Sequence, residues 1–151
     1  MANSKEKISE FVRNNLFKKP DPDAIPRMSR MLLVDRTITD INVKDSTYHD
    51  YTALHYQARY GTTGSVAWLL RQDPPPDIDV RDSSSYQYAP LMYAAYSDED
   101  PEGKVRLLLD HGADRDIKEC IGRTALDIAR AYNRPASVID ILENYRPDVS
   151  R

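Results

Sequence analysis

A short segment of this chain occurs three times in altered form, and each copy is followed by an apolar segment with helical spacing. The copies read TALHYQARYG at 52–61, APLMYAA at 89–95 and TALDIAR at 124–130. The apolar segments that follow them are VAWLL at 66–70, VRLLL at 105–109 and VIDIL at 138–142. A repeat of this size cannot bury its apolar face alone, so stacked neighbours must bury it together. The repetition therefore predicts a solenoid.

Two landmarks give the spacing of the repeat. The leucines of the recurring segment, Leu54, Leu91 and Leu126, are 37 and 35 residues apart. Acidic segments at 40–45, 77–82 and 114–119 recur at steps of 37 residues. The two landmarks agree, and they divide the chain into units of nearly constant length.

The segment TALH at 52–55 resembles the Thr-Pro-Leu-His-x-Ala signature of the ankyrin repeat, whose period is about 33 residues. HGAD at 111–114 resembles the family's tail after the second helix of each repeat. The second copy departs from the signature at Ala89 and Met92, and the third carries Asp127 in place of the histidine. The resemblance implies an all-α ankyrin-repeat solenoid of stacked antiparallel helix pairs with β-turn fingers between them.

This phasing predicts one domain over 1–151. It consists of an N-terminal capping repeat at 1–45, repeats at 46–82 and 83–119, and a C-terminal capping repeat at 120–151. Extra residues fall in the first two fingers and in the turn at 97–103, where insertions cost little closure entropy. We expect Gly61 to end a helix, and Gly112 and Asn133 to adopt left-handed conformations there.

Composition restricts the classes of function. The net charge is −3 with a sequence pI near 5.6, which argues against a nucleic-acid partner. Cys120 is the only cysteine, so no internal disulfide forms and an intracellular location is favoured, cytoplasmic with the nucleus as an alternative. We expect neither a signal peptide nor a membrane-spanning segment.

Side chains that could perform chemistry are few. We interpret His55 as the signature histidine that holds the turn, and His111 as a polar residue at a helix C-terminus. His49 and Asp50 are adjacent in the first finger, but a metal site needs three or four ligands. Cys120 has no strongly activating neighbour. We therefore expect no enzyme and no cofactor, and keep a metal or catalytic role at His49, Asp50 and His55 as an alternative.

Tyrosines supply the candidate binding site. The chain has 10, and eight of them lie between residues 48 and 96. In ankyrin-repeat proteins the fingers and the exposed face of the first helices form a concave groove, so the resemblance implies a tyrosine-rich binding surface. We expect Trp68 to lie in the core. The candidate protein-binding residues are Tyr48, Tyr51, Tyr56, Arg59, Tyr60, Tyr86, Tyr88, Tyr93 and Tyr96.

The sequence thus predicts a non-catalytic protein–protein interaction module that acts as an adaptor or as an inhibitor masking its partner. Tyrosine and arginine dominate interface energies, so we expect the hot spots among Tyr56, Arg59, Tyr60, Tyr93 and Tyr96, with the other four tyrosines at the finger tips. Individual rings could instead pack between fingers and hold the turns. The acidic turn at 97–102 is either a solvated loop or a surface that steers a basic partner. We expect a monomer, with a self-assembling homodimer as a further alternative.

Overall fold

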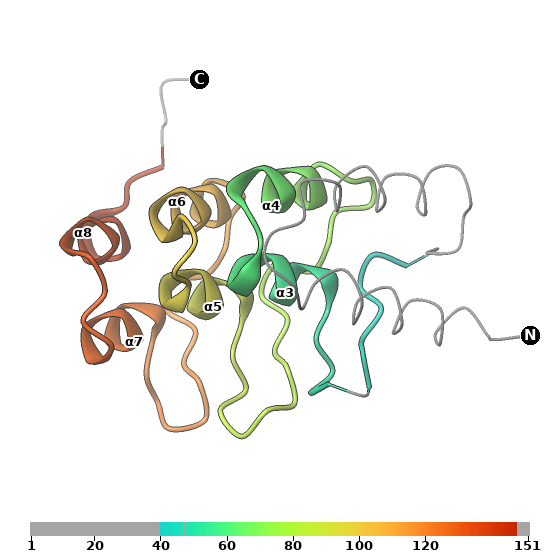
Figure 1. Ribbon diagram of the computed structural model, residues 1–151, viewed down its shortest axis with the longest axis horizontal. Helices are drawn as coiled ribbons and strands as arrows, with labels where there is room; N and C mark the ends of the chain where they lie inside the picture. The colour runs from blue at the N-terminus through green and yellow to red at the C-terminus, as the bar shows by residue number, and fades with distance from the viewer. Residues whose placement is uncertain (1–39, 47, 148–151) are drawn as a thin grey trace, which may run out of the picture.

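The computed structural model describes residues 40–46 and 48–147. These residues form six α-helices in three antiparallel pairs (Figure 1). The pairs are α3 (Ala53–Tyr60) with α4 (Thr63–Leu70), α5 (Pro90–Tyr96) with α6 (Pro101–Asp110), and α7 (Ala125–Ala131) with α8 (Ala136–Asn144). The predicted helices of the N-terminal capping repeat lie outside the described residues. The all-α repeat architecture expected from the sequence is confirmed.

The helices form two layers. Helices α3, α5 and α7 lie side by side in one layer, with the fingers extending from it, while α4, α6 and α8 form the other (Figure 1). In the described part of the chain, strand-like pairing is limited to one antiparallel bridge between Asp45 and Tyr51. None of the described helices has the length and apolar character needed to cross a membrane.

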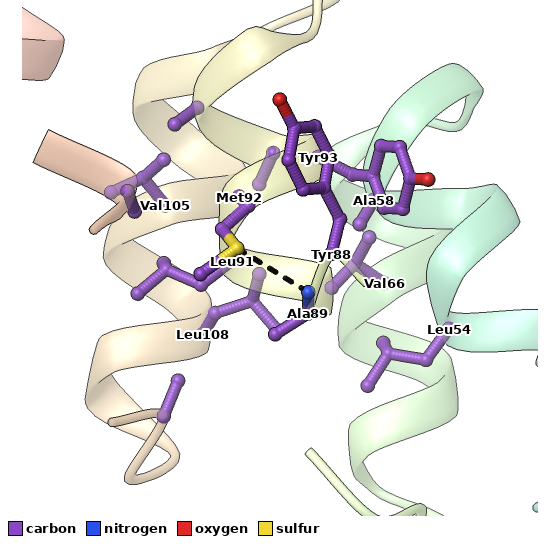
Figure 2. Packing of buried hydrophobic residues seen from close by; sticks show 14 of the residues in the cluster. Leu54, Ala58, Val66, Tyr88, Ala89, Leu91, Met92, Tyr93, Val105 and Leu108 are labelled. Carbon is purple, nitrogen blue, oxygen red and sulfur yellow. Dashed lines mark hydrogen bonds between the residues drawn. The ribbon is translucent and has the colours of Figure 1, made fainter. Parts of the chain in front are cut away.

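Apolar side chains from both layers fill the space between them (Figure 2). Small residues such as Ala58 and Ala94, each fully buried, let neighbouring helices approach closely. Leu54, Leu91 and Leu108 are at most 2% exposed, and burying a leucine stabilises a fold by about 2 kcal/mol. Trp68, which we expected in the core, packs against its edge and is only partly buried.

Each first helix begins with the same contact made by different chemistry. The Thr52 N–H donates to His55 Nδ1 at 3.0 Å, and the Thr124 N–H donates to Asp127 Oδ2 at 3.0 Å. In the second repeat the Ala89 N–H meets Met92 Sδ at 3.5 Å (Figure 2). A side-chain acceptor three residues into the helix therefore satisfies the first backbone donor in each of the three described helix pairs, even where the threonine and histidine are absent.

Hydrogen bonds from backbone N–H groups to side chains join the repeats to one another. The Asp77 N–H donates to Asn42 Oδ1 at 2.6 Å, and the Asp114 N–H donates to Asp79 Oδ1 at 3.0 Å. Asn42 and Asp79 occupy the same position in their acidic segments, so the 37-residue spacing reflects a repeated contact. Left-handed conformations at Gly112, with φ 89°, and Asn133, with φ 50°, end their helices as expected.

The fingers are closed at the base and linked side by side. The first closes with Asp45 N–H donating to Tyr51 O at 2.8 Å, and the other two close in the same way. The Ser83 N–H donates to His49 O at 2.8 Å, which ties the second finger to the first. A matching bond of 2.9 Å from the Cys120 N–H ties the third to the second. The fingers therefore form a continuous edge.

His55 holds the first helix to the second finger. Its ring is fully buried, and Nε2 lies 3.0 Å from Val80 O and 3.2 Å from Tyr88 O. Because Nδ1 accepts the Thr52 N–H, the proton lies on Nε2 and serves these two carbonyls. Burial lowers the pKa of His55 below its ordinary value. The turn-holding role expected for this histidine is confirmed.

Replacing His55 with alanine should destabilise the fold strongly. The change leaves the buried Thr52 N–H and the partly buried Val80 carbonyl without this partner, removes one of the two donors to Tyr88 O and opens a cavity, a loss of about 3 kcal/mol. His111→Ala is the matched control, since its ring is exposed and hydrogen-bonds to Leu107 O, and its loss should cost at most ~0.5 kcal/mol. Urea unfolding of both variants measures the difference. Equal losses would contradict the structural role of His55.

Candidate functional site

Two adjoining hollows open on the surface formed by α3, α5 and the fingers. The first has a volume of about 250 Å³ and is lined by Tyr48, His49, Tyr51, Arg59, Ser84, Tyr86, Tyr88, Tyr93, Tyr96 and Tyr132. The second has a volume of about 290 Å³ and is lined by Arg59, Tyr60, Tyr96, Ser97, Asp98 and Glu99. Arg59 and Tyr96 border both hollows. We call the two together the tyrosine groove.

The Arg59 guanidinium lies among aromatic rings where the hollows meet. Its Cζ is 4.8 Å from the centroid of Tyr60, 5.5 Å from Tyr93 and 6.0 Å from Tyr96. Nη1 also donates to the Tyr51 hydroxyl at 3.3 Å. Cations over tyrosine faces are attracted by the ring quadrupole. The rings therefore fix the position of a half-buried positive charge in the groove.

Buried hydrogen bonds fix the floor of the groove. The Tyr93 hydroxyl donates to Asp82 and lies in hydrogen-bond contact with the Tyr51 hydroxyl. Asp82 also accepts from Ser84 N–H at 2.9 Å and Ser84 Oγ at 2.6 Å. Burial, together with the contact to Asp82, raises the pKa of Tyr93 far above its ordinary value. This network joins the second finger to α5 and to the first finger.

The first repeat makes the corresponding contact with Tyr56 and Asp45, whose hydroxyl and carboxylate are 3.2 Å apart. In the third repeat Ile128 stands at the position of Tyr56 and Tyr93. Glu119 Oε2 is buried there without a hydrogen-bond donor in the part of the chain that the structure describes. The carboxylate–tyrosine contact is thus a feature of the first two repeats.

Side-chain exposure divides the nine candidate residues into two groups. Tyr51, Tyr56, Tyr88 and Tyr93 are at most 7% exposed. Tyr56 has no exposed surface and lines neither hollow, so the proposal below leaves it out of the contact residues. The other three, Tyr51, Tyr88 and Tyr93, line the first hollow with little exposed surface and form its floor. Accessible surface remains at the rim, on Tyr48, Arg59, Tyr60, Tyr86 and Tyr96.

One rim residue was missed by the sequence analysis. Tyr132 is 45% exposed, and its ring meets that of Tyr96 edge to face with centroids 4.8 Å apart. It lies six residues after Leu126, as Tyr60 lies six residues after Leu54. Extending the alignment of the first helices to the third repeat would have identified it.

A buried lysine supports the end of α3 from behind the groove. Lys104 Nζ donates to Gly61 O at 2.9 Å and to Ser97 Oγ at 2.7 Å, and Ser97 Oγ donates to Arg59 O at 2.8 Å. The side chain is fully buried, which lowers the pKa of Lys104 to about 8. The turn expected at 97–103 is shorter than predicted, since α6 begins at Pro101.

Few side chains in the described residues are arranged to bind a metal ion or to react covalently. Both ring nitrogens of His55 are engaged in the hydrogen bonds described above. Within residues 40–46 and 48–147, His, Cys, Asp and Glu side chains form no group of three or more that could hold a metal. Cys120 Sγ donates to Ser85 O at 2.9 Å. The alternative centred on His49, Asp50 and His55 therefore lacks a ligand set in the described residues.

Comparison with protein families identifies one match. The family model described as ankyrin repeats, in three copies, matches residues 24–119, which is more than half of the chain. A comparison with curated proteins finds no match.

Removing the Tyr93 hydroxyl should destabilise the fold. Tyr93→Phe leaves the buried Asp82 carboxylate without one of its donors, which costs about 1–3 kcal/mol. Tyr86→Phe is the matched control, because its ring is 46% exposed and the same change should cost at most ~0.5 kcal/mol. Urea denaturation followed by circular dichroism provides the comparison, and a neutral Tyr93→Phe variant would refute the network.

Lys104 should give the protein a distinctive pH dependence. Between pH 8 and 10 the unfolded chain keeps the lysine proton while the folded chain loses it. The free energy of unfolding should therefore rise by about 2 kcal/mol across this window. Above about pH 10 the slope should reverse, because burial raises tyrosine pKa values, that of Tyr88 to about 12.

Urea unfolding at half-unit pH steps measures this slope. Lys104→Met should flatten it, whereas Lys118→Met, a change at an exposed lysine, should leave it intact. A wild-type slope of zero or opposite sign between pH 8 and 10 would show that Lys104 stays charged in the folded state.

Proposed function

The chain belongs to the ankyrin-repeat family, whose repeats are generally protein–protein interaction modules, and we propose that it binds a protein partner through the tyrosine groove. The contact residues in this proposal are the accessible rim residues Tyr48, Arg59, Tyr60, Tyr86, Tyr96 and Tyr132.

The composition of the rim is the observation that carries the proposal. Tyrosine and arginine are the residue types in which interface energy concentrates. A tyrosine brings a large contact area and a polar hydroxyl while losing little conformational freedom. Both hollows are open to solvent, whereas small-molecule sites typically enclose most of their ligand. The groove therefore suits individual side chains of a protein partner better than an enclosed ligand.

The rigidity of the floor also supports binding. The contacts among Tyr51, Tyr93 and Asp82 are buried, and Lys104 anchors the far end of α3. A surface held in one conformation before binding loses less entropy when the partner arrives. The partner would therefore meet a preformed groove.

The groove binds without chemical conversion of its partner in this proposal, since members of this family are typically non-enzymatic. The role is that of an adaptor, or of an inhibitor that covers a functional surface of its partner. The two roles differ in whether the bound partner keeps its activity, and an activity assay of the partner with and without the chain separates them.

A rim variant should lose its partner. Tyr96→Ala combined with Tyr132→Ala removes the ring pair on one wall of the groove, and the affinity should fall at least tenfold if either ring is a hot spot. The partner is found by comparing proteins captured from cells that express the chain, and its affinity is then measured by calorimetry with purified components.

The matched control is Tyr145→Ala, which removes a tyrosine that follows α8 and bonds Asp110 away from both hollows. It should keep the wild-type affinity. If the rim variant retains the partner, binding uses another surface. If the chain captures only itself and sediments as a dimer that the rim variant abolishes, self-assembly replaces binding of a different protein.

A further inference from the structure

Four arginines in the described residues are half-buried, and three of them have satisfied charges. Arg123 pairs with Glu119 at 3.4 Å, and Arg134 pairs with Asp98 at 3.0 Å. Arg115 donates to carbonyl oxygens at the end of α8 at distances of 3.3 to 3.4 Å. A half-buried guanidinium in this fold therefore normally meets an anion or the negative end of a helix.

Arg59 is the exception. Within residues 40–46 and 48–147 its guanidinium makes no ion pair, and the hydrogen bonding of that group is limited to the Tyr51 hydroxyl at 3.3 Å. A guanidinium has five N–H donors, which lie in its plane. The faces of the surrounding tyrosine rings attract its positive charge but accept no hydrogen bonds from these N–H groups. It also lies where both hollows meet. The groove thus presents a positioned cation with unused donors.

We propose that Arg59 receives a carboxylate from the partner, so that the tyrosine groove selects a peptide segment carrying an acidic side chain. This inference rests on the proposed function and names the chemistry of the partner. A carboxylate matches the planar guanidinium with two parallel hydrogen bonds. The flanking rings of Tyr60 and Tyr96 would contact apolar or aromatic side chains on either side of it.

The charges around the groove favour a partner segment with a single carboxylate over one with a phosphate or with several consecutive acidic residues. Phosphate recognition relies on clusters of arginines, and Arg59 is the one arginine that lines the hollows. Glu99 lines the same hollow as Arg59 and would repel a dianion or a second acidic residue, while the charge of Asp98 beside it is paired with Arg134. One acidic residue among apolar neighbours therefore fits best.

A purely structural role for Arg59 makes a different prediction. If the guanidinium only stabilises the tyrosine rings, its replacement changes stability but leaves peptide preference unchanged. The test must therefore measure which peptides the groove prefers. A display library of random nine-residue peptides, screened on the full chain, supplies binders even while the natural partner is unidentified.

The selected peptides should share one Asp or Glu beside an apolar or aromatic residue. Replacing that acidic residue with its amide should weaken binding to the wild type at least tenfold. Arg59→Gln should bind the acidic and amide peptides equally, whereas Arg59→Lys should keep a preference for the acidic one. Arg130→Gln is the matched control, since Arg130 is exposed and pairs with Glu143 outside the groove.

The remaining outcomes separate this inference from the function it rests on. Peptides that lose binding with Tyr96→Ala but tolerate the amide would overturn the carboxylate assignment and leave groove binding in place. Tighter binding of a phosphorylated version would overturn the assignment in favour of phosphate. A library whose binders are unaffected by Tyr96→Ala and Tyr132→Ala, or that yields no binder, would count against both proposals.

Discussion

The buried carboxylates at the bases of the fingers are the constraint on which this structure depends. Asp45 and Asp82 are at most 4% exposed, and a buried charge is tolerated only when donors surround it. Tyrosine hydroxyls from the first helices supply those donors, through Tyr56 to Asp45 and Tyr93 to Asp82. The first two fingers are therefore each held to their helix by a contact that neither partner could satisfy alone. These contacts therefore determine the shape of the surface between the fingers and the helices.

This arrangement separates tyrosines that stabilise the fold from those available to a partner. Rings on the helix face toward the fingers are covered by them and become the floor. Arg59 lies three residues beyond Tyr56, on a neighbouring part of the helix surface, and remains accessible. Because floor and rim lie against each other, as Arg59 does against Tyr93, a substitution in the floor would also move the rim. A loss of binding can be attributed to the rim residues only in variants whose stability is unchanged.

The periodic features of the fold could be predicted from the sequence, while the exposure of single side chains could not. Regular spacing of Leu54, Leu91 and Leu126 predicts stacked helix pairs, because identical units must bury identical faces. The burial of Tyr56 depends on how a finger folds over its helix, which spacing does not specify. The cap formed by Met92 was also beyond prediction, since thioether acceptors are weak and have no recognised signature. Tyr132, by contrast, could be identified by aligning the first helices of the repeats.

The third repeat shows why the groove ends where it does. Its finger is two residues shorter, and Ile128 replaces the tyrosine that would reach the finger-base carboxylate. Arg123 partly substitutes for it, pairing with Glu119 and donating to the Tyr88 hydroxyl at 3.4 Å. The charged side chain of Arg123 therefore lies at the edge of the aromatic floor, beside Tyr88. The third repeat therefore contributes a wall, through Tyr132, while the other residues that line the two hollows come from the first two repeats.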